Sequence, residues 1–191
     1  MMLFNNEPQI QSGERPTLLL HVCCAPCASY VLEYLSQSYE LTAFFYNPNI
    51  RPREEYNKRL AEFQRFLALS KSPADLIIGE YDADDFESIS NPFNDEPEGG
   101  RRCEACFDFR LDRTAEHAAR DGYDCFTTTL SVSPHKNATL LNEIGNKLTE
   151  KHSVEYLCAD FKKRDGYKRS ITLSKQYGLY RQTYCGCLPL L

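Results

Sequence analysis

Apolar residues fall into five short runs along the chain, each with the length of a buried strand. We expect strands over residues 17–22, 41–46, 75–78, 124–130 and 154–159. Between these runs apolar residues recur at helical spacing, which predicts helices over residues 28–37, 52–70, 103–122, 137–151 and 166–177. The regular alternation of strand and helix predicts an α/β fold with a mostly parallel, five-stranded sheet and helices on both faces.

Two segments lie outside this pattern. Residues 1–16 are polar and are expected to form a flexible tail before a single domain at residues 17–191. Residues 82–102 carry seven acidic side chains among Asn, Pro and Gly, which predicts a long loop of the kind that is often functional. If the first strand is central, the residues that follow it lie in the ligand-binding crevice at the carboxyl end of the sheet.

The composition, with 42% hydrophobic and 26% charged residues, is that of a soluble globular protein. No apolar run approaches the roughly 20 residues of a membrane helix, and the N-terminal residues contain no apolar signal region, so we expect a cytoplasmic protein. The net charge of -5 argues against a broad electrostatic contact with nucleic acid, although it leaves room for a local basic patch. In a reducing compartment, 9 cysteines favour metal or redox chemistry over a disulfide framework.

Two groups of cysteines have the spacing of metal ligands. Cys23, Cys24 and Cys27 follow the first predicted strand, and Cys103 and Cys106 open the third predicted helix. Four thiolates from two such places fit an all-cysteine zinc site or an iron–sulfur cluster, and the position in the crevice favours the cluster. A rival interpretation makes Cys24 and Cys27 a thioredoxin-type redox pair, which leaves the other three cysteines without a role.

The third group of cysteines is a pair near the end of the chain, where Gly186 separates Cys185 from Cys187. A disulfide between them closes a small strained ring that is easily reduced, and glycine relieves part of the strain. The pair therefore fits a redox switch, and the alternative is two further metal ligands. Cys125 and Cys158 stand alone in predicted strands and are expected to be small buried residues.

Several motifs, in one order, resemble a single family, the QueH-type epoxyqueuosine reductases. These motifs are LLHVCCAPC at residues 19–27, FYNPNI at 45–50, RCEAC at 102–106, TTLSVSPHK at 128–136, DFKK at 160–163 and LYRQTYCGC at 179–187. The resemblance therefore extends over nearly the whole predicted domain. It implies a fold of the HUP type, related to the PP-loop ATP-binding enzymes.

The resemblance also implies a reaction and its cofactors. The expected enzyme is an oxidoreductase that removes the epoxide oxygen of epoxyqueuosine at wobble position 34 of tRNA, the last step of queuosine biosynthesis, without cobalamin. It implies four ligands to a [4Fe–4S] cluster, namely Cys23, Cys24, Cys103 and Cys106. It further implies a redox-active disulfide between Cys185 and Cys187, and a single metal ion, expected to be iron, beside the cluster, with Cys27 as candidate ligand.

One physical difficulty accompanies the proposed cluster. Adjacent residues of a strand point to opposite faces, so Cys23 and Cys24 can share one cluster only if the chain turns between them. Without that turn, one of them serves the second metal, together with Cys27.

The chemistry needs an acid, electrons and protons. We expect an iron with an open coordination position to act as Lewis acid on the epoxide oxygen. The dithiol of Cys185 and Cys187 would supply two electrons, or pass on those of a donor whose identity the sequence leaves open. The candidate proton donors are Tyr184, His135 and Asp160.

Basic and aromatic residues near the end of the chain fit contact with a single-stranded RNA loop, in which a base can be splayed into a pocket. The candidate RNA-binding residues are Lys162, Lys163, Arg164, Lys168, Arg169 and Arg181. A smaller basic group consists of Arg51, Arg53, Lys58 and Arg59.

Two other functions remain possible at this stage. A tRNA thiolation enzyme of related fold needs a Gly- and Ser-rich loop for ATP after the first strand, where this chain has Cys-Cys-Ala-Pro-Cys. A zinc-stabilised RNA-binding module would explain the clustered cysteines, but it leaves the Cys-Gly-Cys segment without a role.

Overall fold

A parallel five-stranded sheet forms the centre of the molecule in the computed structural model, which describes residues 15–187. The strand order is β3-β2-β1-β4-β5, and every neighbouring pair is parallel. The first strand is therefore central, as the crevice argument requires. The strands are β1 (Thr17–His21), β2 (Glu40–Phe45), β3 (Asp75–Ile78), β4 (Cys125–Thr128) and β5 (Glu155–Tyr156).

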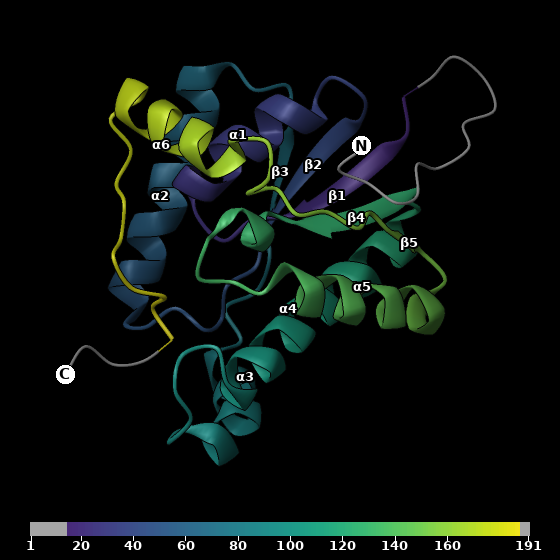
Figure 1. Cartoon of the computed structure of the whole chain (residues 1–191). Coiled ribbons are helices and arrows are strands. Elements are labelled where there is room, and N and C mark those ends of the chain that lie inside the picture. Colours follow the sequence, from purple (N-terminus) through teal and green to yellow (C-terminus); the bar gives the residue numbers. More distant parts are fainter. Residues whose placement is uncertain (1–14, 188–191) are drawn as a thin grey trace.

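Helices cover both faces of the sheet (Figure 1). On one face lie α1 (Ala25–Leu35), α2 (Arg53–Ser70) and α6 (Gly166–Gln176), and on the other lie α4 (Arg101–Asp121) and α5 (Ala138–His152). Each face has its own core, because successive residues of a strand point to opposite sides. Leu18 and Leu20 of β1 pack into the core beneath α1 and α2, whereas Leu19 packs into the core beneath α4 and α5.

The prediction for residues 82–102 is wrong. Instead of a long loop, residues in this range form α3 (Ala83–Ser90), a short 3-10 helix (Asn91–Phe93) and the first turn of α4. Phe86 of α3 is buried and packs against Phe109 of α4, with ring centroids 6.4 Å apart. This tertiary contact, together with acidic residues in the first turn of α3, favours a helix where the composition alone indicated a loop.

The other predicted elements are present with shifted ends. The fourth strand ends at Thr128 because the chain then tightens into a 3-10 helix, Thr129–Val132, whose first turn Thr128 caps. The fifth strand has two residues, and Asn137 caps α5 as predicted. Most of the expected tail, residues 1–14, lies outside the described residues, as do residues 188–191. Within residues 15–187, the model contains no helix with both the length and the apolar character needed to cross a bilayer.

Candidate functional site

A cavity of about 430 Å³ opens beyond the carboxyl ends of β1 and β4. Its lining includes Cys23, Cys24 and Cys27 from the end of β1, together with Leu130 and Val132 from the segment after β4. The segment that follows α6 closes another side of the cavity and contributes Tyr184 and Cys185. The cavity lies where ligands bind in open α/β sheets.

Cys23, Cys24 and Cys27 lie close enough together to hold a metal ion. Their three sulfurs all lie within 4.8 Å of one another, and the Sγ atoms of Cys23 and Cys24 are 3.7 Å apart. Two sulfurs bound to one tetrahedral ion at 2.3 Å lie about 3.8 Å apart, so the spacing fits thiolate ligands. The adjacent cysteines converge because β1 has already ended at His21, and Cys24 is the extended residue that begins α1.

The three thiols differ in acidity. Hydrogen bonds from Cys24 and Cys27 hold the pKa of Cys23 well below its usual range, with a smaller contribution from the charge of Arg110. Because Cys24 and Cys27 donate hydrogen bonds to the thiolate of Cys23, the pKa of Cys24 is raised to about 12 and that of Cys27 is raised well above its ordinary value. One thiolate and two thiols therefore line the cavity.

Cys103 and Cys106 lie in the first turns of α4 and are buried. The amide of Gly99 donates to the sulfur of Cys103 over 3.2 Å, and Arg110 donates to the sulfur of Cys106 over 3.8 Å. Burial raises the pKa of Cys106 to about 11. Among residues 15–187, the group of sulfurs within 4.8 Å consists of the three cysteines after β1, and Cys103 and Cys106 stand apart from it.

The pair near the C-terminus has one acidic and one weakly acidic thiol. A hydrogen bond from Cys187 lowers the pKa of Cys185 to about 5, against the effect of burial, and the charges of Lys136 and Arg110 act in the same direction. The same hydrogen bond raises the pKa of Cys187. A thiolate next to a protonated thiol is the arrangement of a dithiol that forms and breaks a disulfide.

The Cys-Gly-Cys segment is fixed to α2 by a buried ion pair. Glu55 and Arg59 are 2.7 Å apart, and both side chains are less than a tenth exposed. Arg59 also donates to the carbonyl oxygens of Tyr184 and Cys185, at 3.4 and 2.9 Å. The expectation of a small basic group that includes Arg59 therefore needs correction, because this residue is buried and neutralised by Glu55. The segment after α6 runs along α2 in Figure 1.

Two of the three candidate proton donors border the cavity. Tyr184 and His135 are among its lining residues, and partial burial raises the pKa of Tyr184, so its hydroxyl keeps its proton. Asp160 is not among the lining residues, and its carboxylate pairs with Lys162 at 2.9 Å and Lys163 at 3.9 Å.

The candidate RNA-binding residues divide into free and occupied cations. Arg164 and Lys168 are exposed, in the turn before α6 and in its first turn, whereas Lys162 and Lys163 pair with Asp160. Arg169 is also exposed, but its Nε and Nη2 donate hydrogen bonds to the carboxylate of Glu33, at 2.9 and 2.7 Å. Arg181 borders the cavity and so links this basic surface to the cysteines.

His21, for which the sequence predicted no role, lies two residues before Cys23. Its imidazole is fully buried between the hydroxyl of Thr128, at 2.8 Å, and the carbonyl of Tyr46, at 3.1 Å. Burial, aided by the charge of Arg110, lowers its pKa to about 3, so the ring is neutral. The Nε2–H then donates to Tyr46, and the Thr128 hydroxyl donates to Nδ1. The sequence signal that could have pointed to His21 is its position at the end of an apolar run.

Known proteins resemble this chain in fold and in sequence. A predicted subunit of a tRNA methyltransferase from Methanocaldococcus jannaschii shares the fold, with a TM-score of 0.52 at 13% identity, over 83% of this chain and 76% of that one. The epoxyqueuosine reductase QueH of Staphylococcus epidermidis is 43% identical over 184 residues, 93% of this chain and 77% of the relative.

Two further relatives bear the same description. The epoxyqueuosine reductase QueH of Streptococcus pyogenes serotype M1 is 42% identical, over 91% of this chain and 70% of the relative, and that of Thermotoga maritima is 37% identical, over 90% and 88%. A family model described as epoxyqueuosine reductase QueH matches residues 18–189. This chain therefore belongs to the epoxyqueuosine reductase QueH family.

Proposed function

We propose that this chain reduces epoxyqueuosine to queuosine at the wobble position of tRNA by removing the epoxide oxygen. Membership of the family makes it an oxidoreductase. One observation supports the assignment most directly: a single cavity is lined both by the three cysteines after β1, which are close enough together to hold a metal ion, and by Cys185 of the dithiol. A substrate in this cavity can thus meet a metal centre and a reductant together.

The residues around the cavity fit an anionic, thiolate-held cofactor. We assign a [4Fe–4S] cluster to four of the cysteines and a neighbouring metal ion to Cys27; the cluster ligands are Cys23, Cys24, Cys103 and Cys106. Within residues 15–187, Arg102 and Arg110 each have a buried guanidinium Nε without a hydrogen-bond partner, and they lie on either side of Cys103 and Cys106 along α4. When bound, such a centre supplies electron transfer and Lewis acidity toward an oxygen atom.

The dithiol of Cys185 and Cys187 balances the reaction. The epoxide accepts two electrons and two protons, its two carbon–oxygen bonds break, an alkene forms and the oxygen leaves as water. Two thiols that close into one disulfide release two electrons and two protons. Further turnovers need an external reductant of the disulfide. Cys185, as the more acidic thiol, is the one that borders the cavity.

Protons reach the leaving oxygen from side chains that border the cavity. Tyr184 is our first candidate, because it is protonated and is the neighbour of Cys185. His135 is the second candidate, on the opposite element after β4. Asp160 is held by two lysines outside the lining and is ranked last.

The basic surface near α6 fits the backbone of an anticodon loop. Arg164 and Lys168 are exposed for phosphate contacts, and Arg181 with Tyr167 connects this surface to the cavity mouth. A wobble base splayed from its single-stranded loop can stack on an aromatic ring as it enters. The affinity for tRNA should then fall steeply with salt.

The first experiment measures iron, sulfide and zinc in protein purified without oxygen, together with turnover of tRNA that contains epoxyqueuosine. We expect about four irons and four sulfides per chain, further metal at the neighbouring site, and queuosine as product. Zinc in a colourless, inactive chain would replace this proposal with a zinc-stabilised RNA-binding module. ATP-dependent sulfur transfer to tRNA would replace it with a thiolation enzyme.

Variants separate the dithiol from the cluster. Cys185→Ser should keep the colour and the iron content but lose multiple turnover. Cys158→Ser is the matched control. Cys158 is also partly exposed, but it lies two residues after β5, and its thiol donates a hydrogen bond to Asn146. Full multiple turnover by Cys185→Ser would exclude the redox role of the pair.

A further inference from the structure

We propose that Arg110 is the fixed counter-cation of the cysteine centre: its buried charge stabilises the negative charge that the cofactor gains on reduction, and so raises the reduction potential. This inference rests on the proposed function, because it requires a thiolate-held cluster beside α4. Arg110 then acts as a positioning and tuning residue, and it does not itself touch the reacting atoms of the substrate.

Arg110 is a buried cation without an anionic side chain bound to it. The residue is 2% exposed, and within residues 15–187 it forms no ion pair with a carboxylate. One terminal nitrogen donates to the amide oxygen of Asn47, and its Nε has no hydrogen-bond partner. A buried guanidinium of this kind is strongly destabilising unless an anion compensates it. The anion that compensates this charge must therefore lie close to Arg110.

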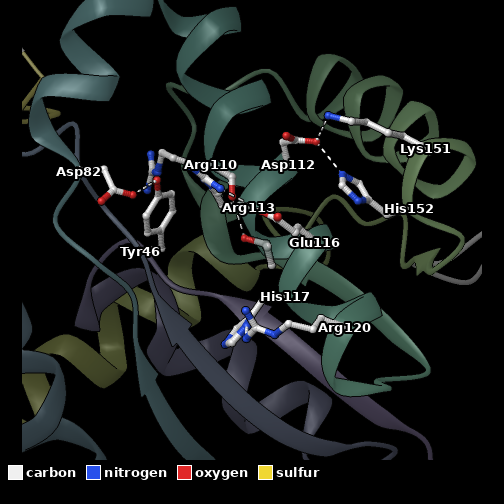
Figure 2. A network of polar contacts seen from close by, with 11 residues as sticks. Tyr46, Asp82, Arg110, Asp112, Arg113, Glu116, His117, Arg120, Lys151 and His152 are labelled. Carbon is white, nitrogen blue, oxygen red and sulfur yellow. Dashed lines mark hydrogen bonds and ion pairs between the residues drawn. The ribbon is translucent and has the colours of Figure 1, made fainter.

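Three acidic side chains drawn near Arg110 in Figure 2 are bound to other groups. Figure 2 shows Asp112 of the same helix turned toward Lys151 and His152, each at 2.7 Å. Glu116 pairs with Arg113 at 3.0 Å, and Asp82 accepts a hydrogen bond from Tyr46, also at 3.0 Å (Figure 2). These acids therefore cannot balance the charge of Arg110.

Cysteine sulfurs are the groups near Arg110 that can carry a negative charge. It follows Cys106 by four residues and Cys103 by seven, so the three side chains share one face of α4. Its Nη1 lies 3.8 Å from the sulfur of Cys106. Its charge also acts on the thiols of Cys23 and Cys185, which come from two other elements. Arg110 is thus the cation shared by all three cysteine groups.

The position of the charge is fixed by Asn47. The amide nitrogen of Asn47 donates to the carbonyl of Val22 over 2.9 Å, while its amide oxygen accepts from Arg110. Val22 directly precedes the cysteines, so one side chain ties the guanidinium to the chain that carries them. Arginine does not lose its proton at any accessible pH, so the charge is constant. A fixed positive charge favours the reduced, more negative form of a neighbouring cofactor.

The test compares reduction potentials of variants loaded with the cluster, by a redox titration followed by visible and electron paramagnetic resonance spectra. Arg110→Met and Arg110→Gln should shift the midpoint to a more negative potential, whereas Arg110→Lys should stay close to the wild type. Arg113→Met removes the same charge from the exposed side of the same helix, where its side chain is 43% exposed, and should cause no comparable shift. Unchanged potentials in Arg110→Met and Arg110→Gln would overturn the inference.

A second measurement, the cluster content of each folded variant, applies to variants that do not bind the cluster. If Arg110→Met and Arg110→Gln fold but hold no cluster while Arg110→Lys does, the requirement for charge is supported. Loss of the cluster in all three variants would show that the shape of arginine is needed, and would overturn the charge argument. Thermal unfolding adds a further readout: Arg110→Met should lower the midpoint of the loaded protein but not that of the cluster-free protein. An equal fall in both forms would make Arg110 purely structural.

These outcomes separate the inference from the proposed function. A wild-type chain that binds no iron–sulfur cluster overturns both. A wild-type chain that binds the cluster and turns over, with variants of unaltered potential, overturns only the role of Arg110.

Discussion

Arg59 donates a hydrogen bond of 2.9 Å to the backbone carbonyl of Cys185, across 126 positions of sequence. The guanidinium is held in place by the buried carboxylate of Glu55, to which Tyr180 also contributes its hydroxyl at 3.3 Å. The backbone amide of Arg51 donates a further hydrogen bond, of 2.8 Å, to the carbonyl of Gly186. Helix α2 and the residues before it therefore determine where the dithiol lies.

Removal of the Arg59 charge should release the Cys-Gly-Cys segment. Arg59→Met leaves Glu55 as a buried carboxylate without its cation, and the loss of one partner of a buried pair costs about 3–5 kcal/mol. We expect this fall in the free energy of unfolding in urea, together with a strong loss of turnover.

Arg65→Met is the control for Arg59. Arg65 also donates to backbone carbonyls far away in the sequence, at Tyr177 and Gly178 at the end of α6, but its side chain is 42% exposed. Its loss should cost far less stability than the loss of Arg59, as expected for an exposed ion pair. Equal effects of the two substitutions would contradict the claim that the buried pair fixes the segment.

Gly186→Ala should disturb the dithiol for two separate reasons. Gly186 has φ +95, a conformation that costs other residues roughly 1–2 kcal/mol, and an added Cβ would lie 3.1 Å from Nη2 of Arg59. Gly122→Ala, with φ +76 and no atom within 4 Å of its Cβ, carries only the backbone strain. We expect both variants to lose stability in urea but only Gly186→Ala to lose turnover.

The sequence predicted the frame of the site but not the contacts inside it. The apolar run before Cys23 predicted a strand, and the cysteines were expected in the ligand-binding crevice on condition that this strand is central. The structure places β1 in the middle of the sheet, and Cys23 lines the cavity. Cys103 was also placed correctly near the start of a helix, although α4 begins two residues earlier, at Arg101. Patterns of this kind are local, so they can be read from one segment at a time.

The roles of Arg59 and Arg110 could not be read in this way. Each depends on partners far away in the sequence, and a basic residue on an amphipathic helix is normally solvated. The helix α3 was missed for the same reason, because the burial of Phe86 depends on α4. The assignment of ligands to the cluster stays a prediction.

The reactivity of Cys185 should titrate near pH 5. Its pKa in the folded protein is lowered to about 5 by the hydrogen bond from Cys187 and by neighbouring cations, from an ordinary value near 8.5. The thiolate is therefore present above pH 5, and its stabilising effect, complete above the ordinary pKa, is lost as the pH falls through 5. The rate of alkylation of Cys185 by iodoacetamide, followed by mass spectrometry, should fall about tenfold per unit below that pH.

Cys125 serves as the internal reference in the alkylation experiment. Burial raises its pKa to about 12, so it should stay unlabelled in the native protein at neutral pH. In Cys187→Ala the rate at pH 6 should fall, because alanine cannot donate the hydrogen bond that lowers the pKa of Cys185. A titration midpoint of Cys185 near 8.5 would contradict the assigned acidity.

Substitutions in the basic surface should distinguish free from occupied cations. Lys168→Ala removes an exposed lysine that is available for a phosphate, so the affinity for tRNA should fall and the slope of its logarithm against log salt should decrease by about one. Arg169→Ala removes an arginine that is already paired with Glu33 through two contacts, and should change the slope less. Filter binding at several salt concentrations measures both slopes, with Lys71→Ala, in the turn after α2, as the control for loss of charge elsewhere on the surface. Equal slopes for Lys168→Ala and Lys71→Ala would place the tRNA on another face of the protein.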